Sequence, residues 1–180
     1  MGCGKTTDER IDNAVRLYIE QLEQTLSRSG KDGFAAAYPI ISIDGQKKYH
    51  LVFACAHPKA AILASDIVNG VEETFLREKE EYKENQSGQM NLFSAEVTAE
   101  QIFDNKVRML KDSILKLSKN KPKNRVLLHY ELLVRDKKWF GKIRGMHITR
   151  ALKELLVEHP EKITCVGTPG SNDSVITILE

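Results

Sequence analysis

The apolar residues near the end of the chain recur with the period of an α-helix, and they predict a helix from His147 to His159. They fall at the i, i+3, i+4, i+7 and i+8 positions that line one helix face: Ile148, Ala151, Leu152, Leu155 and Leu156. The opposite face carries Thr149, Arg150 and Lys153. Pro160 is expected to end the helix, because proline clashes with a continuing turn and disfavours helical angles in the residue before it.

Two short runs rich in β-branched residues follow this helix and predict a β-hairpin. They are Lys162 to Val166 and Ser174 to Leu179. The segment between them, Gly167 to Asp173, is dense in residues that tolerate turn angles. A helix followed by a hairpin is the closing half of a winged helix.

A second amphipathic helix is predicted upstream, from Asp104 to Ser118, and its apolar face consists of Val107, Leu110, Ile114 and Leu117. Leu127 to Val134 is apolar enough to supply a short strand and a middle helix, although periodicity does not fix their order. The order of these elements predicts a winged-helix domain over residues 104–180.

Basic residues concentrate between Asp104 and Lys153. This stretch holds 15 of the chain's 27 Lys and Arg residues and 4 of its 25 Asp and Glu residues, so its net charge is 15 minus 4, or +11, in a chain whose total is +2. Such a segment attracts phosphates through a salt-dependent electrostatic interaction. The alternative is a solvated helical surface with a lysine-rich linker, Lys119 to Arg125, that contacts nothing. Winged helices also serve as modules that bind other proteins.

If the domain binds duplex nucleic acid, its residues take distinct roles. Thr149, Arg150 and Lys153 are expected to line or enter a groove. Lys142 and Arg144 are expected to hold phosphates, and the wing, Thr168 to Asp173, would touch the backbone.

The first half of the chain predicts a helix and a second hairpin. Thr7 or Asp8 can cap a helix that ends near Gly30. Phe34 to Ile43 and Tyr49 to Ala56 read as strands joined by a tight turn at Asp44 and Gly45. The second strand is apolar on both faces, so it should lie inside a sheet that is covered on both sides.

A further helix is predicted from Lys59 to Phe75, with a buried side made of Ala60, Ala64, Ile67, Val68, Val71 and Phe75. From Glu72 to Glu100, 8 acidic residues accompany 3 basic ones, as is typical of a solvated connection. The chain thus divides into an αββα lobe over residues 1–84, a linker over 85–103 and the winged-helix domain, which together form an α+β fold. Met90 to Phe93 is an apolar patch in the linker that docks onto a domain or partner, or contacts its own chain.

The segment YHLVFACAHPKA, from Tyr49 to Ala60, is followed by a helix, by QMNLF at Gln89 to Phe93, and by the predicted winged helix. In this order the elements resemble the C-terminal part of three-Cys-motif partner proteins, whose Rossmann-like, methyltransferase-type domain ends in a strand pair of the form YxLxFAxxHPKG. Ala60 stands where that family often has glycine. The first βαβ units, where such a fold would bind S-adenosylmethionine at a Gly-rich turn, have no counterpart in this sequence. The resemblance therefore implies the end of a Rossmann-like fold followed by a regulatory or binding tail.

No cluster of residues predicts a catalytic, cofactor or metal site. Gly2 to Thr7 (GCGKTT) matches only the end of a phosphate-binding loop. Cys55 and His57 share a strand face, but two ligands do not make a zinc site. The three cysteines, which include Cys3 and Cys165, are odd in number and far apart, which fits a reducing compartment. No apolar run approaches the ~20 residues of a membrane span, so we expect a cytoplasmic protein.

The aromatic pair Trp139 and Phe140 lies among basic residues: Lys137, Lys138, Lys142 and Arg144. The pair either stacks on a base or fills the core between the middle helix and the last helix. Three separated histidines are expected to be packed or surface residues rather than general bases: His129, His147 and His159.

The sequence therefore favours a nonenzymatic protein that binds duplex nucleic acid, or the regulatory tail of a three-Cys-motif partner-like protein. One alternative is a truncated or split S-adenosylmethionine-dependent methyltransferase-like subunit, which would be an enzyme only with its other half supplied. Another is a protein-protein interaction module, in which the open hairpin edge binds a protein partner or a second copy in a homodimer.

Overall fold

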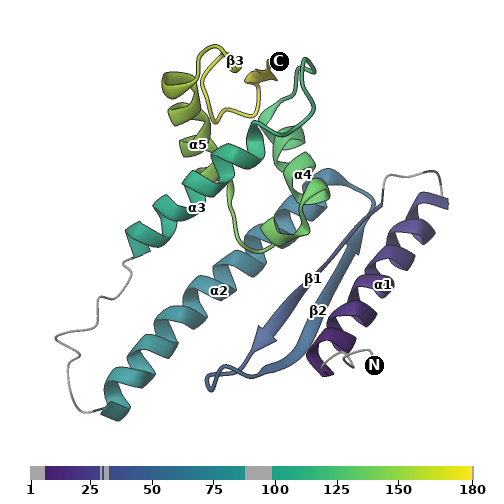
Figure 1. Cartoon of the computed structure of the whole chain (residues 1–180), viewed down its shortest axis with the longest axis vertical. Helices are drawn as coiled ribbons and strands as arrows, with labels where there is room; N and C mark the ends of the chain where they lie inside the picture. Colours follow the sequence, from purple (N-terminus) through teal and green to yellow (C-terminus); the bar gives the residue numbers. More distant parts are fainter. Residues whose placement is uncertain (1–6, 29, 31–32, 88–98, 180) are drawn as a thin grey trace, which may run out of the picture. The chain divides into compact units, whose positions relative to one another are not determined.

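Figure 1 shows a mixed α+β protein built from helices and two antiparallel hairpins, which confirms the predicted class. This computed structural model describes residues 7–28, 30, 33–87 and 99–179. The chain divides into two compact units, residues 1–64 (unit 1) and 65–180 (unit 2). No helix in the described ranges is long and apolar enough to cross a membrane.

Unit 1 joins a helix to a β-hairpin, in the order that the sequence predicted: α1 (Thr7–Arg28), β1 (Phe34–Ile41) and β2 (Lys47–Cys55). The strands are antiparallel, and Gly45 in the turn between them has a φ of 84°. In Figure 1, α1 runs alongside the hairpin. Nζ of Lys47 donates a hydrogen bond to the carboxylate of Asp12 at 2.7 Å, and the N–H of Ala35 donates to Oε1 of Glu23 at 3.0 Å.

The prediction that the second strand lies inside a sheet covered on both faces is wrong. Among the described residues, β1 and β2 pair only with each other. Tyr49 and Leu51 of β2 are 64% and 48% exposed. The helix α1 covers the opposite face, where Nε2 of His50 lies 3.7 Å from Oδ1 of Asp12. Because alternate strand residues point to opposite faces, Tyr49 and Leu51 turn away from α1.

The helix α2 (Pro58–Ser87) crosses the boundary between the two units. It confirms the predicted helix and continues beyond the expected end at Phe75. The expected linker, residues 85–103, starts inside α2, and residues 88–98, with the patch Met90 to Phe93, lie outside the described residues.

The predicted buried side of α2 is partly wrong. Ile67 and Val71 are 59% and 62% exposed. Ser65 and Asn69 are fully buried instead, and both hydrogen-bond to the backbone of Gly141. The helical period shows which residues share a face, but it does not show that two polar side chains will find buried partners far along the chain.

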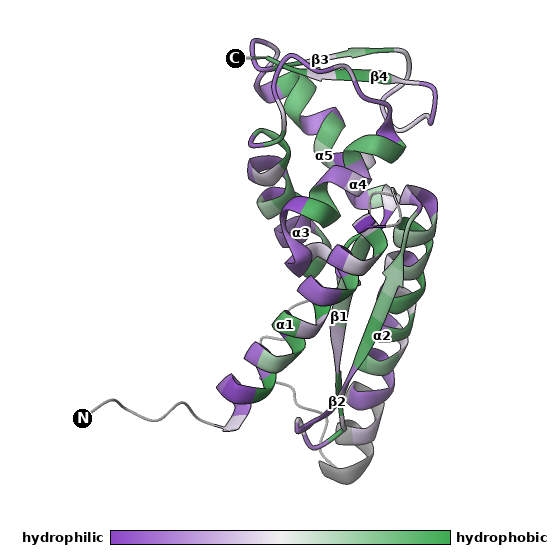
Figure 2. Ribbon diagram, turned by 90° about the vertical axis from the view of Figure 1, so that its right-hand side faces the viewer, coloured by the Kyte–Doolittle hydropathy of each residue, from purple (hydrophilic) through white to green (hydrophobic). Residues whose placement is uncertain are grey.

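Unit 2 continues with three helices, a 3₁₀ turn and a second hairpin: α3 (Ala99–Ile114), α4 (Arg125–Arg135), η1 (Lys137–Trp139), α5 (Gly145–Glu158), β3 (Ile163–Val166) and β4 (Val175–Ile178). The helix α5 and the antiparallel hairpin agree with the prediction. Figure 2 shows hydrophobic stretches of α5, β3 and β4 in green. The core consists of residues at most 2% exposed, among them Val107, Leu110, Ile114, Leu117, Leu128, Leu132, Ile148, Ala151, Leu152, Leu155, Ile163, Ile176 and Ile178.

The predicted division of Leu127 to Val134 into a strand and a helix is wrong, because the whole segment is helical. The side chain of Asn124 caps α4 by accepting a hydrogen bond from the N–H of Leu127 at 2.9 Å. The strand-like residue of this region lies just before the cap instead: Lys123 forms a β-bridge with Ile176. The strand β4 therefore lies between Lys123 and β3.

The basic segment from Lys119 to Arg125 is not a linker that contacts nothing. Lys123 is 9% exposed, and its ammonium group donates to the carbonyl oxygen of Ser118 at 2.6 Å and lies 3.2 Å from Oε2 of Glu131. The segment therefore belongs to the fold of unit 2.

Candidate nucleic-acid interface

The structure divides the five predicted binding residues between two sites on unit 2. Thr149, Arg150 and Lys153 belong to α5, whereas Lys142 and Arg144 lie in the segment that leads from η1 into it. Arg144 is the N-cap residue of α5.

The outer face of α5 presents Arg150 and Lys153 to solvent. Nε of Arg150 lies 2.6 Å from Oε1 of Glu154, and the Arg150 side chain is still 60% exposed. Lys153 is exposed and forms no ion pair with any residue that the structure describes. These side chains border a shallow groove of about 240 Å³, whose lining also includes Val157 and Glu158.

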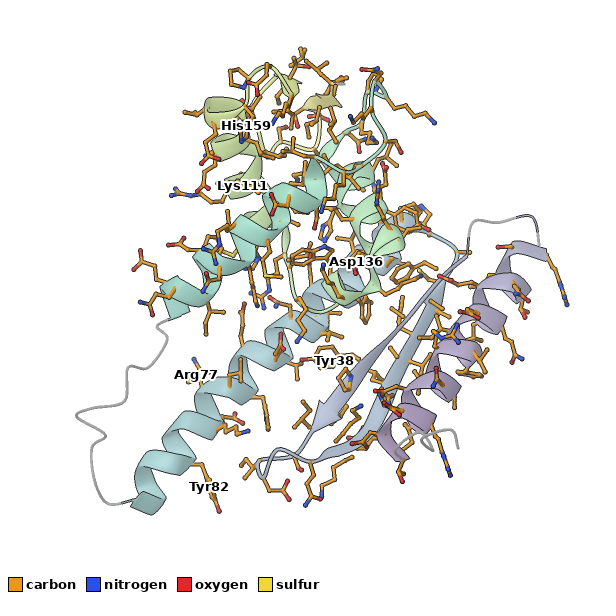
Figure 3. All side chains as sticks on the ribbon, in the orientation of Figure 1. Tyr38, Arg77, Tyr82, Lys111, Asp136 and His159 are labelled. Carbon is orange, nitrogen blue, oxygen red and sulfur yellow. The ribbon has the colours of Figure 1, made fainter. Side chains whose placement is uncertain are left out.

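The acidic residues on this face are held by a lysine from α3. Nζ of Lys111 lies 3.0 Å from Glu154 and 2.9 Å from Glu158. Figure 3 shows Lys111 on α3, beside α5. The hydrogen bond from Lys111 lowers the pKa of Glu154. Because Lys111 partly neutralises these carboxylates, the cations of α5 stay attractive to a polyanion.

Thr149 lies beneath the loop between β3 and β4 rather than on the open face. Its hydroxyl donates to the carbonyl oxygen of Gly145 at 3.0 Å. Gly170 packs so closely that an added Cβ would meet Cγ2 of Thr149 at 2.5 Å, and its φ of +99° favours glycine. The side chain of Thr149 thus supports the loop.

Arg125 and Asn172 are two residues of this region that the sequence analysis missed. Nε and Nη2 of Arg125 donate to Oδ1 of Asn172 at 3.2 and 2.8 Å. The contact ties the start of α4 to the loop between β3 and β4. Nη1 of Arg125 also lies 2.5 Å from where a Cβ on Gly145 would stand. The sequence carries no sign of this pairing, because the two residues are 47 positions apart.

Lys142 and Arg144 face acidic residues of α2. Nζ of Lys142 lies 2.7 Å from Oε1 of Glu72, and Nη1 of Arg144 lies 3.2 Å from Oε2 of Glu73. Arg144 also packs against Gly70, where an added Cβ would meet Nη2 at 2.7 Å. In the sequence these glutamates belong to an acidic stretch that is typical of a solvated connection, so their contact with Lys142 and Arg144 could not be predicted from it.

Two further charged groups of the same region have perturbed pKa values. Burial raises the pKa of Asp66 on α2, although the positive charges of Arg144 and Arg125 oppose the shift. Burial lowers the pKa of Lys106 on α3, against the attraction of nearby glutamates of α2. Cations and carboxylates are therefore concentrated where α2 meets the N-terminal end of α5.

Trp139 and Phe140 fill the core, which excludes the alternative that they stack on a base. They are 3% and 2% exposed. Nζ of Lys138 lies 5.2 Å from the centre of the Trp139 ring.

Two of the three histidines are packed, as expected. His129 and His147 are 3% and 2% exposed, and burial lowers the pKa of each to about 4. Nδ1 of His147 accepts a hydrogen bond from the N–H of Arg144 at 3.0 Å, and its ring stacks on Phe103 with centroids 4.6 Å apart. Both rings are thus neutral parts of the core near pH 7.

The short Cys55 and His57 segment has a structural role at the start of α2. Nδ1 of His57 accepts a hydrogen bond from the N–H of Lys59 at 3.2 Å. In the described part of the chain, no group of three or more His, Cys, Asp or Glu side chains is placed to hold a metal ion. Of the segment Gly2 to Thr7, which matches only the end of a phosphate-binding loop, residues 2–6 lie outside the described residues and Thr7 starts α1.

The resemblance to three-Cys-motif partner proteins rests on local segments, of which Gln89 to Phe93 falls outside the described residues. The segment from Tyr49 to Ala60 forms most of β2 and the start of α2. The resemblance stays a prediction. No protein-family model, curated protein or solved structure matches this chain.

Proposed function

We propose that unit 2 is a winged-helix module that binds duplex nucleic acid through the phosphate backbone. The observation that carries the proposal is the order and pairing of its elements. A helix (α3), a short extended segment at Lys123, two helices (α4 and α5) and a hairpin follow one another, and Lys123 adds a third extended segment beside β4. In such modules the last helix before the hairpin enters the groove, and the hairpin loop contacts the backbone.

The distribution of charge supports phosphates as the ligand. The stretch from Asp104 to Lys153, which makes up less than half of unit 2, has a net charge of +11. Lys153 on α5 and the exposed Lys119 and Lys121 make no ion pair within the described residues. Arg150 keeps most of its side chain in solvent despite its contact with Glu154. Exposed surface cations of this kind release counterions when they meet a phosphate backbone.

The side chains available on α5 suit contacts with phosphates or with guanine rather than with adenine. The helix contains no Asn or Gln, which would read adenine through paired hydrogen bonds. Thr149 is covered by the loop that contains Gly170. Arg150 and Lys153 remain as the principal contacts, and both can bind phosphates.

The direct test is fluorescence anisotropy of a labelled duplex at several salt concentrations, with the intact chain and with the variant Arg150→Glu/Lys153→Glu. We expect the variant to bind at least ~10-fold more weakly, and its dependence of log affinity on log salt to be shallower by about two. The control is Lys48→Glu/Lys59→Glu, which changes the total charge equally but alters exposed residues of unit 1.

Two results would contradict the proposal. One is the absence of duplex binding by the intact chain at low salt. The other is equal loss of affinity in the α5 variant and the unit 1 control, which would assign the attraction to total charge rather than to α5.

A second candidate function, docking of a protein or of another copy of this chain, is favoured by the hairpin of unit 1. Tyr49 and Leu51 are exposed on β2, and β1 and β2 pair only with each other among the described residues. Open strand edges beside apolar side chains can pair with another strand. Light scattering of the intact chain that shows only a monomer at working concentration would remove the homodimer.

A further inference from the structure

The helix α2 packs within unit 2 through polar contacts. The N–H of Gly141 donates to Oγ of Ser65 at 3.0 Å, and Nδ2 of Asn69 donates to the carbonyl oxygen of Gly141 at 3.1 Å. Among the described residues of α2 from Ser65 onward, Val68 is the only apolar one that is less than a tenth exposed. Because burial of apolar surface contributes most to stable packing, α2 is held far less firmly than α3 or α5.

The contact places carboxylates of α2 on the cations beside the start of α5. Glu72 contacts Lys142, and Glu73 contacts Arg144, at 2.7 and 3.2 Å. These cations adjoin the N-terminus of α5, where the helix dipole also favours negative charge. The carboxylates of α2 thus occupy positions that suit phosphate groups.

The contact also leaves polar atoms unsatisfied. Oδ1 of Asp66, Oδ1 of Asn69 and Oε2 of Glu72 are buried and have no hydrogen-bond partner among the residues that the structure describes. The amine of Lys106 is half-buried and forms no ion pair with a described residue. A buried polar atom without a partner loses its hydration and gains nothing in return, so each one weakens the attachment of α2.

We propose that α2 is an autoinhibitory element of the nucleic-acid interface. Glu72 and Glu73 form ion pairs with Lys142 and Arg144 until a phosphate backbone displaces the two glutamates. The inference rests on the proposed function of unit 2, and it adds that the apparent affinity is set by competition between α2 and the ligand. In the displaced state, Lys142 and Arg144 join Arg150 and Lys153 as phosphate contacts.

The test is the affinity of Glu72→Gln/Glu73→Gln for a labelled duplex at about 50 mM salt and above. Glutamine keeps the shape of the side chain and removes its charge. We expect ~10-fold tighter binding than for the wild-type chain, and a salt dependence steeper by up to about two, because two more cations become free to release counterions. The control is Glu78→Gln, an equal charge change per residue at an exposed position of α2.

A second measurement uses the wild-type chain, so it does not depend on the folding of a variant. Hydrogen exchange of the backbone amides from residue 65 to 75 should become faster in saturating duplex than without it, because displaced α2 loses its contacts with residues 141–144. Unchanged or slower exchange would overturn the displacement of α2.

The outcomes separate this inference from the proposed function. If the wild-type chain binds duplex and the double variant binds no tighter than Glu78→Gln, the autoinhibitory role of α2 is overturned while the winged-helix proposal stands. If neither binds at low salt, the proposed function fails and this inference fails with it.

Discussion

Acidification from about pH 7 to about pH 4 should destabilise unit 2 through two buried histidines. His129 and His147 are both in the core, and burial is the largest cause that lowers the pKa of each from 6.5 to about 4. The unfolded chain therefore binds a proton at each histidine below about pH 6.5, whereas the folded chain does not until about pH 4. Because the folded pKa is the lower one, stability is lost as the pH falls through this window.

The size of the effect follows from the two pKa values. A shift of one pKa unit corresponds to about 1.4 kcal/mol, so each histidine should lower the free energy of unfolding by about 2 kcal/mol at about pH 5 and by about 3 kcal/mol at about pH 4. The sum for both approaches the total stability of an ordinary domain, about 5–15 kcal/mol. Lys111 also lowers the pKa of Glu154 from 4.5, so the stabilisation from this carboxylate starts to be lost as the pH falls below about 4.5.

Urea unfolding followed by circular dichroism at several pH values measures this loss. The variants His129→Gln and His147→Asn remove the titrating groups, and Asn retains an acceptor near the position of Nδ1 that receives the N–H of Arg144. Combining them should flatten the stability curve between about pH 6.5 and about pH 4. His159→Gln is the control, because the His159 side chain is 39% exposed. A wild-type chain equally stable at about pH 7 and about pH 5 would refute the reasoning.

Two further predictions concern packing. Leu152→Ala removes a fully buried side chain of α5 and should lower the free energy of unfolding by about 2–5 kcal/mol in urea titration, whereas Val157→Ala, at an 82% exposed position, should change it by less than about 0.5 kcal/mol. Gly170→Ala should cost about 1–3 kcal/mol, because the positive φ is strained for alanine and the new Cβ would strike Thr149. Gly45→Ala shares the positive φ but meets open space, so a loss of melting temperature as large as that of Gly170→Ala would contradict the assigned clash.

The sequence predicts the helices of unit 2 well, because each buries one apolar stripe and the stripe is visible as a period. The residues Ile148, Ala151, Leu152 and Leu155 were expected on the buried face of α5 and are at most 1% exposed. Periodicity was less informative where a single side chain decides the structure. Asn124 caps α4, so Leu127 to Val134 became wholly helical, although its composition also suits a strand.

The candidate site was harder to predict because charge was read along the chain, whereas it acts through space. Lys142 and Arg144 belong to a segment of high positive charge, and the net charge of that segment suggested that both are free to bind phosphate. In the structure each meets a glutamate of α2 about 70 residues earlier. The acidic stretch of α2 and the basic stretch of unit 2 therefore partly neutralise each other. The net charge of the basic segment alone overstates the positive charge that is available to a ligand.

The same comparison explains why Arg150 and Lys153 carry the proposed function. A cation that already lies against a carboxylate must exchange one ion pair for another when it meets a phosphate, so its net contribution to binding is small. Lys153 has no such partner among the described residues. Arg150 is paired with Glu154, but Lys111 also neutralises that carboxylate, and the Arg150 side chain remains 60% exposed. Binding should therefore begin at the outer face of α5, and Lys142 and Arg144 should contribute only after α2 has moved away from them.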